Sequence, residues 1–281
     1  MTGRAVAVVT RDPKLYGELA LTLRDRHIPV LSLFPGEPIP SRVKVVVTSP
    51  EECDQVRHRR VIPAYPGDRA ALLAAIEDAY HEGPRGGILV GIDPGPRPGF
   101  AVVRSDGTCL VQGVIESPEA VVRLYRSLRY FFAEPLLLFR VGNGDAIRRD
   151  RILNALLSNH VPVEMVNERR TTPPGRRQSD LLAAVAIAAT PGRRVSHQEP
   201  LRITRGDVAH LQSLSRRHSN GRYTISRRLA RTVLAGEISL AEALDLTASR
   251  QARGDEPHPP GLRRASRGTP PNPETGRPSA S

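Results

Sequence analysis

The stretch Ile88–Gly99 constrains the fold of this chain more than any other. Four apolar residues run up to a single acid, Asp93, and a turn rich in proline and glycine follows. A short apolar run that glycine bounds is typical of a strand buried on both faces. The acid therefore ends a strand, where an ionised carboxylate is costly unless it is paired or bound to a metal. Two further apolar runs, at 100–103 and 109–115, predict a three-strand meander that begins with this strand.

After the meander, the sequence predicts alternating helices and strands up to about residue 190. Helices are expected at 117–133, 146–159 and 181–189, and strands at 136–141 and 161–166. The order is then β-β-β-α-β-α-β-α, and helical crossovers make strands one, four and five parallel. Their carboxyl ends share one edge, where open α/β sheets bind ligands. Asp93 and Glu168 lie at this edge, and Asp180 opens the last helix and can reach it.

Residues 1–83 predict a small α/β domain, which resembles half of a receiver-like or flavodoxin-like fold in outline. Asp12 follows its first strand, and it either mimics a receiver acid or caps the next helix. A glycine- and proline-rich linker separates this domain from residues 86–190.

The C-terminal part, residues 200–250, predicts three short helices, at 205–217, 224–235 and 239–249. The middle helix carries arginines on a polar face opposite its apolar residues, namely Arg227, Arg228 and Arg231. This pattern indicates either a helix-turn-helix-like module or a solvated basic bundle. Residues 254–281 are rich in Pro, Gly, Arg and Ser, which predicts disorder.

The charge of the chain favours a polyanionic partner. The net charge is +12, and residues 191–281 contribute +8 of it. Arginine makes up 39 of the 41 basic residues, a bias that fits phosphate contacts as well as genome composition or heat adaptation.

No stretch approaches the roughly 20 apolar residues of a membrane span, and the first apolar run is too short for a signal peptide. Neither Cys53 nor Cys109 has a neighbour at metal-ligand spacing. We therefore expect a cytoplasmic protein without a membrane partner.

Three motifs within residues 86–190 carry a resemblance to a known superfamily. They are GIDPG at the end of strand one, VNERRTT after strand five, and SDLLAAVAIA at the last helix. Together they resemble the RNase H-like superfamily, closest to the branch of RuvC Holliday-junction resolvases and YqgF-type nucleases of ribosomal-RNA maturation. This chain departs from the RuvC-type pattern at one point. RuvC-type chains have a further acid at the end of strand four, where this chain has Arg140-Val141-Gly142-Asn143. The expected fold class is thus α/β: a central RNase H-like mixed sheet, a small N-terminal α/β domain and a C-terminal helical, helix-turn-helix-like module.

The resemblance implies a nuclease that depends on Mg²⁺ (or Mn²⁺) and cleaves branched DNA or structured RNA. Asp93 would bridge two metal ions, with Glu168 and Asp180 each completing one side, because hard cations prefer carboxylate oxygens. Nearby arginines would hold the substrate backbone, namely Arg169, Arg170, Arg176 and Arg177. A two-fold-symmetric junction would favour a homodimer.

Each acid also has a simpler interpretation. Asp93 could initiate a turn, Glu168 could form a surface ion pair, and Asp180 could complement a helix dipole. Asp145 could replace the missing acid or merely cap the helix after strand four, and Glu119 could serve a helix start. Two further function classes stay open: a non-catalytic nucleic-acid-binding protein with the same fold, and an actin-like or sugar-kinase-like phosphotransferase. The latter would need a second phosphate loop that residues 191–281 do not supply.

Overall fold

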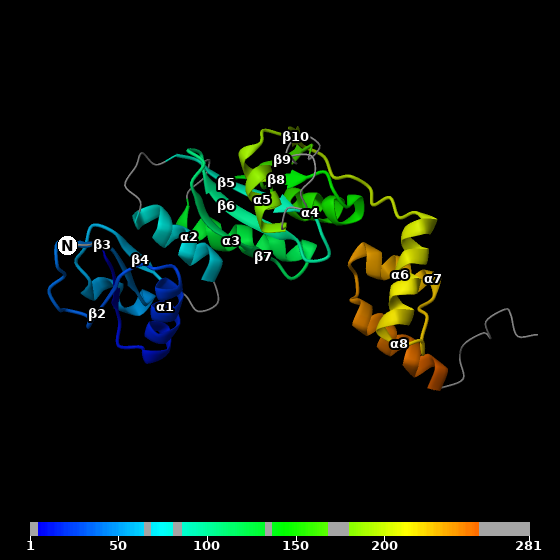
Figure 1. Cartoon of the computed structure of the whole chain (residues 1–281), viewed down its shortest axis with the longest axis horizontal. Helices are drawn as coiled ribbons and strands as arrows, with labels where there is room; N and C mark the ends of the chain where they lie inside the picture. Colours follow the sequence, from blue (N-terminus) through cyan, green and yellow to red (C-terminus); the bar gives the residue numbers. More distant parts are fainter. Residues whose placement is uncertain (1–4, 65–68, 81–85, 133–136, 168–179, 253–281) are drawn as a thin grey trace, which may run out of the picture. The chain divides into compact units, whose positions relative to one another are not determined.

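The computed structural model describes residues 5–64, 69–80, 86–132, 137–167 and 180–252. The chain divides into two compact units. The first unit comprises Met1–Asp207 with Leu234–Gly236, and it contains two β-sheets with their helices. The second comprises Val208–Val233 and Glu237–Ser281, and its described residues are helical and connecting segments (Figure 1).

The N-terminal sheet has four parallel strands in the order β2-β1-β3-β4. They are β1 (Ala5–Val9), β2 (Val30–Leu33), β3 (Val43–Thr48) and β4 (Val61–Pro63). Helix α1 (Pro13–Asp25) follows β1, and the 3₁₀ helix η1 (Pro50–Gln55) follows β3. The strands run parallel, as the alternation of strands and helices in this small α/β domain favours.

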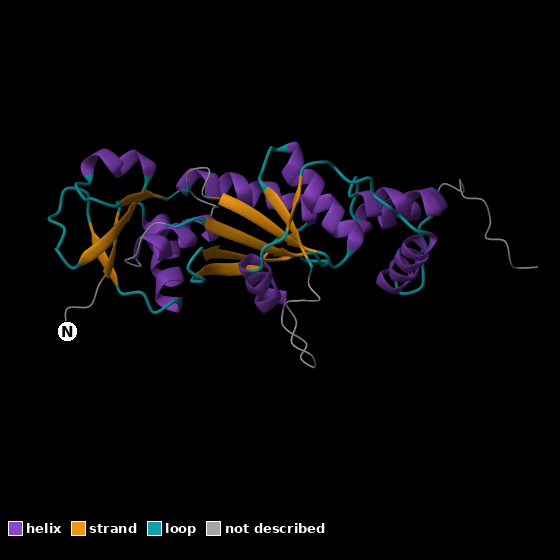
Figure 2. Ribbon diagram, turned by 90° about the horizontal axis from the view of Figure 1, so that it is seen from above, coloured by secondary structure: helices purple, strands orange, loops and turns teal. Residues whose placement is uncertain are grey.

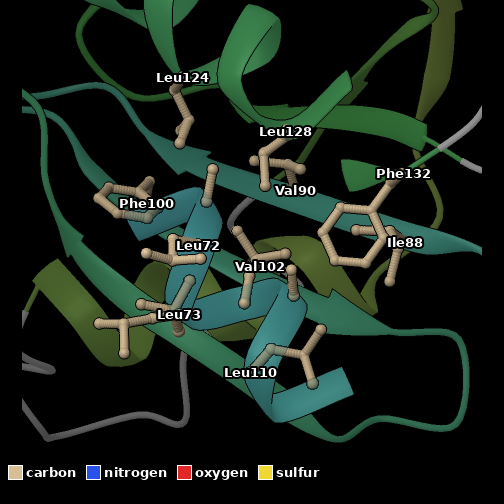
Figure 3. Close-up of a cluster of buried hydrophobic side chains, with 14 of the residues drawn as sticks. Leu72, Leu73, Ile88, Val90, Phe100, Val102, Leu110, Leu124, Leu128 and Phe132 are labelled. Carbon is tan, nitrogen blue, oxygen red and sulfur yellow. The ribbon is translucent and has the colours of Figure 1, made fainter. Parts of the chain in front are cut away.

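Helix α2 (Arg69–Tyr80) is buried on all sides over residues 71–76. The sequence predicts one apolar face for this helix, but a helix that is apolar all round packs against neighbours on every side. Figure 3 shows Leu72 and Leu73 in the same cluster of buried side chains as Phe100 of the central sheet. The cluster also contains residues of β1 and β3. Helix α2 therefore joins the cores of the two sheets.

The central sheet is mixed, with the order β10-β9-β8-β5-β6-β7. Figure 2 shows its strands in orange, with helices in purple beside them. Its strands are β5 (Ile88–Asp93), β6 (Gly99–Arg104), β7 (Cys109–Val114), β8 (Leu137–Gly142), β9 (Val163–Val166) and β10 (Arg193–Val195). Strand β5 runs parallel to β8, and β8 runs parallel to β9, as predicted. Strand β6 is antiparallel to both its neighbours. The short antiparallel strand β10, beside β9, was not predicted.

Helices cover both faces of this sheet. Helix α3 (Val121–Phe131), which follows the 3₁₀ turn η2 (Pro118–Ala120), and α4 (Ala146–Ser158) pack in the same cluster as Ile88, Val90 and Ile92. Because side chains alternate along a strand, the other residues of β5 face the opposite side. There Leu89 packs with residues of α5 (Asp180–Ala189).

The C-terminal helices are α6 (Arg205–His218), α7 (Arg227–Ala235) and α8 (Leu240–Ala252). They bury a small apolar core that consists of Val208, Leu211, Ile225, Leu229, Ala230 and Ala243. Among the described helices of the chain, none combines the length and the apolar character that a membrane crossing needs. Residues 254–281, for which the sequence predicts disorder, lie outside the described residues.

Candidate active site

Strand β5 carries Asp93 to the edge where the carboxyl ends of β5, β8 and β9 meet, which we call the rim. Asp93 is the last residue of β5 and is half-buried. Alternation along the strand puts Asp93 on the same face as Leu89 and Gly91, the face that α5 covers. The predicted location of this acid, at the end of a buried central strand, is confirmed.

Glycines lie on both sides of Asp93 in the sheet. Asp93 pairs with Gly99 of β6. On the other side, Gly91 pairs with Arg140 of β8, so the same register puts Gly142 beside Asp93. A glycine brings no side chain, so the neighbouring strands place none beside Asp93 at these two register positions.

Helix α5 lies unusually close to β5 at Gly91. A Cβ atom on Gly91 would be 2.0 Å from the carbonyl oxygen of Ala184 and 2.6 Å from the amide nitrogen of Ala188. Only glycine therefore permits this approach. Asp180, the first residue of α5, precedes Ala184 by about one helical turn, or about 6 Å along the axis. Asp93 follows Gly91 by two strand residues, about 7 Å.

A buried ion pair fixes the other end of α5. Arg140 donates from Nε to Oε2 of Glu164 at 2.9 Å and from Nη1 to the carbonyl oxygen of Ala188 at 2.6 Å. The same carboxylate accepts a hydrogen bond from the amide of Gly192 at 3.1 Å. A cation at a helix C-terminus also complements the helix dipole. The pair therefore anchors α5 to strands β8 and β9.

The polar residues after β8 have structural partners. The Asp145 carboxylate accepts from the Arg148 amide at 3.0 Å, so Asp145 caps α4, as its simpler interpretation states. Asn143 accepts a hydrogen bond from Nη1 of Arg149. Asp145 thus serves its own helix.

Glu119 does more than begin a helix, because its carboxylate binds Arg151. The two Glu119 oxygens accept from Nε and Nη2 of Arg151 at 2.7 Å and 2.9 Å. Burial, the largest single cause, raises the pKa of Glu119. The hydrogen bonds and charge of Arg151, together with hydrogen bonds from the Glu119 backbone and Ser117, lower the pKa below its usual range.

The remaining predicted residues of this site lie outside the described residues or lack a described side chain. Glu168, Arg169, Arg170, Arg176 and Arg177 belong to residues 168–179. Asp180 is placed by its backbone at the start of α5. Among the described residues, no group of three or more His, Cys, Asp or Glu side chains could hold a metal ion. The structure thus places Asp93 at the rim and leaves the predicted triad untested.

The N-terminal sheet has a second edge of this kind, at the carboxyl ends of β1 and β3. Asp12 caps α1 by accepting from the amides of Lys14 and Leu15 at 2.8 Å and 3.3 Å. Its interpretation as a helix cap therefore has structural support.

Glu52 fills the same edge of the N-terminal sheet. Its carboxylate accepts from Thr10 Oγ1 at 2.6 Å, the Arg11 amide at 2.8 Å and Ser49 Oγ at 3.0 Å. Burial raises the pKa of Glu52, but these hydrogen bonds have the larger effect and lower it. Sequence reasoning missed this contact, although Ser49 and Glu52 have the spacing of a capping box.

Two family models match parts of the chain. Residues 5–79 match a response regulator receiver-like domain. Residues 204–250 match a three-helical bundle domain. The central sheet lies outside both matches, and no curated protein and no solved structure matches the chain. The N-terminal part is thus similar to a receiver-like domain, as its outline in the sequence indicates.

Proposed function

We propose that the central sheet carries a Mg²⁺-dependent nuclease site that hydrolyses phosphodiester bonds of structured nucleic acid. The observation that carries the proposal is the position of Asp93, at the end of the central parallel strand and between Gly99 and Gly142 in register. A carboxylate in such a place lies at the edge where open α/β sheets bind ligands.

The strand order supports an RNase H-like fold for this domain. The five strands that the sequence predicts follow the order β7-β6-β5-β8-β9, and β6 alone runs against the others. Strands β5 and β9 therefore end at the rim together. The close approach of α5 at Gly91 packs the middle and the last turn of that helix, at Ala184 and Ala188, against the same strand.

The chemistry of the donor set fits a hard divalent cation. Asp93, Glu168 and Asp180 would hold Mg²⁺ through carboxylate oxygens, and the bound ions would supply an activated water and neutralise charge on the phosphate. Arg169, Arg170, Arg176 and Arg177 would hold the substrate backbone, because guanidinium groups bind phosphates in a bidentate manner. The substrate would be a branched DNA or a structured RNA, and a cytoplasmic location stays a prediction.

A second candidate function is non-catalytic nucleic-acid binding by the same fold. The observation that favours it is the excess of positive charge in residues 191–281, +8 of the net +12, which can bind phosphates without catalysis. This binder would retain the arginines and would not need Asp93.

The test is a cleavage assay with the full chain. We would incubate it with a four-way DNA junction and with precursor RNA, in Mg²⁺ or in EDTA, and read the products on a gel. We expect cleavage in Mg²⁺ only, and a loss of about 10³-fold or more for Asp93→Asn, since metal ions supply several kcal/mol of transition-state stabilisation.

Asp145→Asn is the matched control, because Asp145 lies after the neighbouring strand and asparagine caps a helix equally well. This variant should cleave within about twofold of the wild type. If Asp93→Asn cleaves like the wild type, the nuclease site is not at the rim. If no substrate is cut while binding is retained, the protein is a binder rather than a nuclease.

A further inference from the structure

The C-terminal bundle separates its charges along the chain. Between Val208 and Gly236 there are six arginines and no Asp or Glu. The six are Arg216, Arg217, Arg222, Arg227, Arg228 and Arg231, and all are exposed. The acids of the bundle flank this stretch: Asp207 precedes it, the exposed Glu237 directly follows it, and Glu242 and Asp245 are exposed on α8. One stretch, from the end of α6 through α7, is therefore strongly cationic.

These arginines keep their charge available. None of them forms an ion pair with another residue in the described part of the chain. Arg216 donates from Nε to Thr224 Oγ1 at 3.0 Å and so braces the connection before α7. We call the other five, from Arg217 to Arg231, the arginine face.

Capping at the other two helices of the bundle follows the usual rule. The Thr204 amide donates to the Asp207 carboxylate at 2.8 Å at the start of α6. The Ser239 amide donates to Glu242 at 2.7 Å at the start of α8, and the Glu242 amide donates back to Ser239 at 3.1 Å. Each helix thus has an acid in its first turn, where a negative charge is favourable.

Helix α7 departs from that rule. Ser226 caps it by accepting from the Leu229 amide at 3.2 Å, but the first two helical residues are Arg227 and Arg228. Two cations at the positive end of a helix dipole are unfavourable for the isolated helix. Such local conflicts are expected where a sequence serves binding rather than stability. A polyanion placed there would relieve both charges.

The connections between the helices argue against base reading by α7. Helix α7 follows a connection of residues 219–226, whereas a short turn of residues 236–239, with Gly236 at φ 82°, leads into α8. In a helix-turn-helix module, the helix after the short turn reads the bases. Here that helix exposes Glu242 and Asp245, which phosphates would repel.

We infer that the arginine face is a docking surface for the phosphate backbone of nucleic acid, and that it binds without regard to base sequence. Guanidinium groups match phosphate oxygens in geometry, and their contacts release counterions. A lipid surface fits less well, because the apolar side chains Ile225 and Leu229 are buried and cannot insert. The inference takes its class of partner from the proposed function but does not require catalysis.

The test is binding of the full chain to fluorescently labelled 30-base-pair DNA duplexes, measured by anisotropy over a range of salt concentrations. We expect the triple variant Arg227→Gln/Arg228→Gln/Arg231→Gln to lose about 100-fold in affinity near 0.15 M salt. The slope of log K against log salt should fall by about 3, or about 1 for each lost contact. Duplexes of unrelated sequence should bind the wild type within about threefold of one another.

The matched control removes two exposed arginines of the same bundle that lie outside the arginine face. Arg205→Gln/Arg250→Gln should bind within about twofold of the wild type and keep its salt slope. The three positions of the triple variant and the two of the control are all exposed. Each variant should therefore retain the helical circular dichroism and melting temperature of the wild type.

Three results would overturn the inference. They are wild-type affinity and slope in the triple variant, an equal loss in the control variant, or binding to phosphatidylserine vesicles in place of DNA. A strong preference for one duplex sequence would instead show that bases are read. The two proposals fail separately, since the triple variant leaves the acids of the rim in place and is read by binding, whereas Asp93→Asn leaves the arginine face in place and is read by cleavage.

Discussion

The two sheets of this chain both present acids at the carboxyl ends of parallel strands, but the acids have different surroundings. In the receiver-like sheet, Asp12 caps α1, and Glu52 receives three hydrogen bonds from residues at the ends of β1 and β3. In the central sheet, Asp93 lies between glycines of the two adjacent strands. At the first edge the acids are held by side chains and amides of the adjoining loops, whereas at the second the neighbours of the acid in register are glycines.

The difference teaches that an acid at a strand end does not by itself indicate a site. The neighbours of the carboxylate decide whether it stabilises the fold or can meet a ligand. For Glu52, donors from two loops make the carboxylate part of the structure. For Asp93, the neighbour in register on β6 is a glycine, and α5 packs closely on the same face of β5 at Gly91.

The largest effect on stability is expected from a substitution at Gly91, where α5 packs against the central sheet. Gly91→Ala would put a Cβ atom 2.0 Å from a backbone oxygen of α5. We expect a loss of about 2–3 kcal/mol in the free energy of unfolding, as for other overpacked cores. Chemical denaturation of the purified variant measures it.

The matched control is the same substitution in α1, the helix that begins at the edge of the receiver-like sheet. A Cβ atom on Gly17 would meet nothing within 4 Å. Gly17→Ala should therefore raise stability by about 0.5–1 kcal/mol, because alanine favours a helix. If both variants have wild-type stability, the close approach of α5 does not exist in solution.

A smaller effect is expected at Glu52. The Glu52→Gln variant loses charge-assisted hydrogen bonds and should be about 1 kcal/mol less stable than the wild type at pH 7. Because the pKa of Glu52 is lower in the folded protein, its carboxylate stabilises the fold above the unfolded pKa. This contribution disappears as the pH falls through the folded pKa.

The measurement is therefore denaturation of both proteins at several pH values between 7 and about 3. The difference between the wild type and Glu52→Gln should be present at neutral pH and vanish in acid. If the difference in the free energy of unfolding grows in acid, or is absent at every pH, the hydrogen bonds of Glu52 do not stabilise this edge.

Much of the fold could be predicted from the sequence, because its strands are short apolar runs between clear turns. The pattern placed Asp93 at the end of β5 and predicted that β5, β8 and β9 run parallel. Strand β10 was missed, because three residues with two arginines give no apolar run. The start of α7 was set three residues too early, because Ser226 takes the cap position.

The contacts that define the two edges could not be predicted, since they join residues far apart in the chain. Thr10 and Glu52 are 42 residues apart, and Arg140 and Ala188 are 48 apart. No local pattern specifies such pairs. A glycine within a buried strand was the one local signal, and it fits the close packing of α5 on Gly91.

The most direct measurement of the central claim is Mn²⁺ binding, followed by the electron paramagnetic resonance signal of the free ion. The wild type and Glu52→Gln should bind Mn²⁺ equally, because the Glu52 carboxylate is engaged within the receiver-like sheet. Asp93→Asn should bind at least about tenfold more weakly, because it loses a carboxylate ligand. Equal binding by the wild type and Asp93→Asn, or an equal loss in Glu52→Gln, would contradict a metal site at the rim.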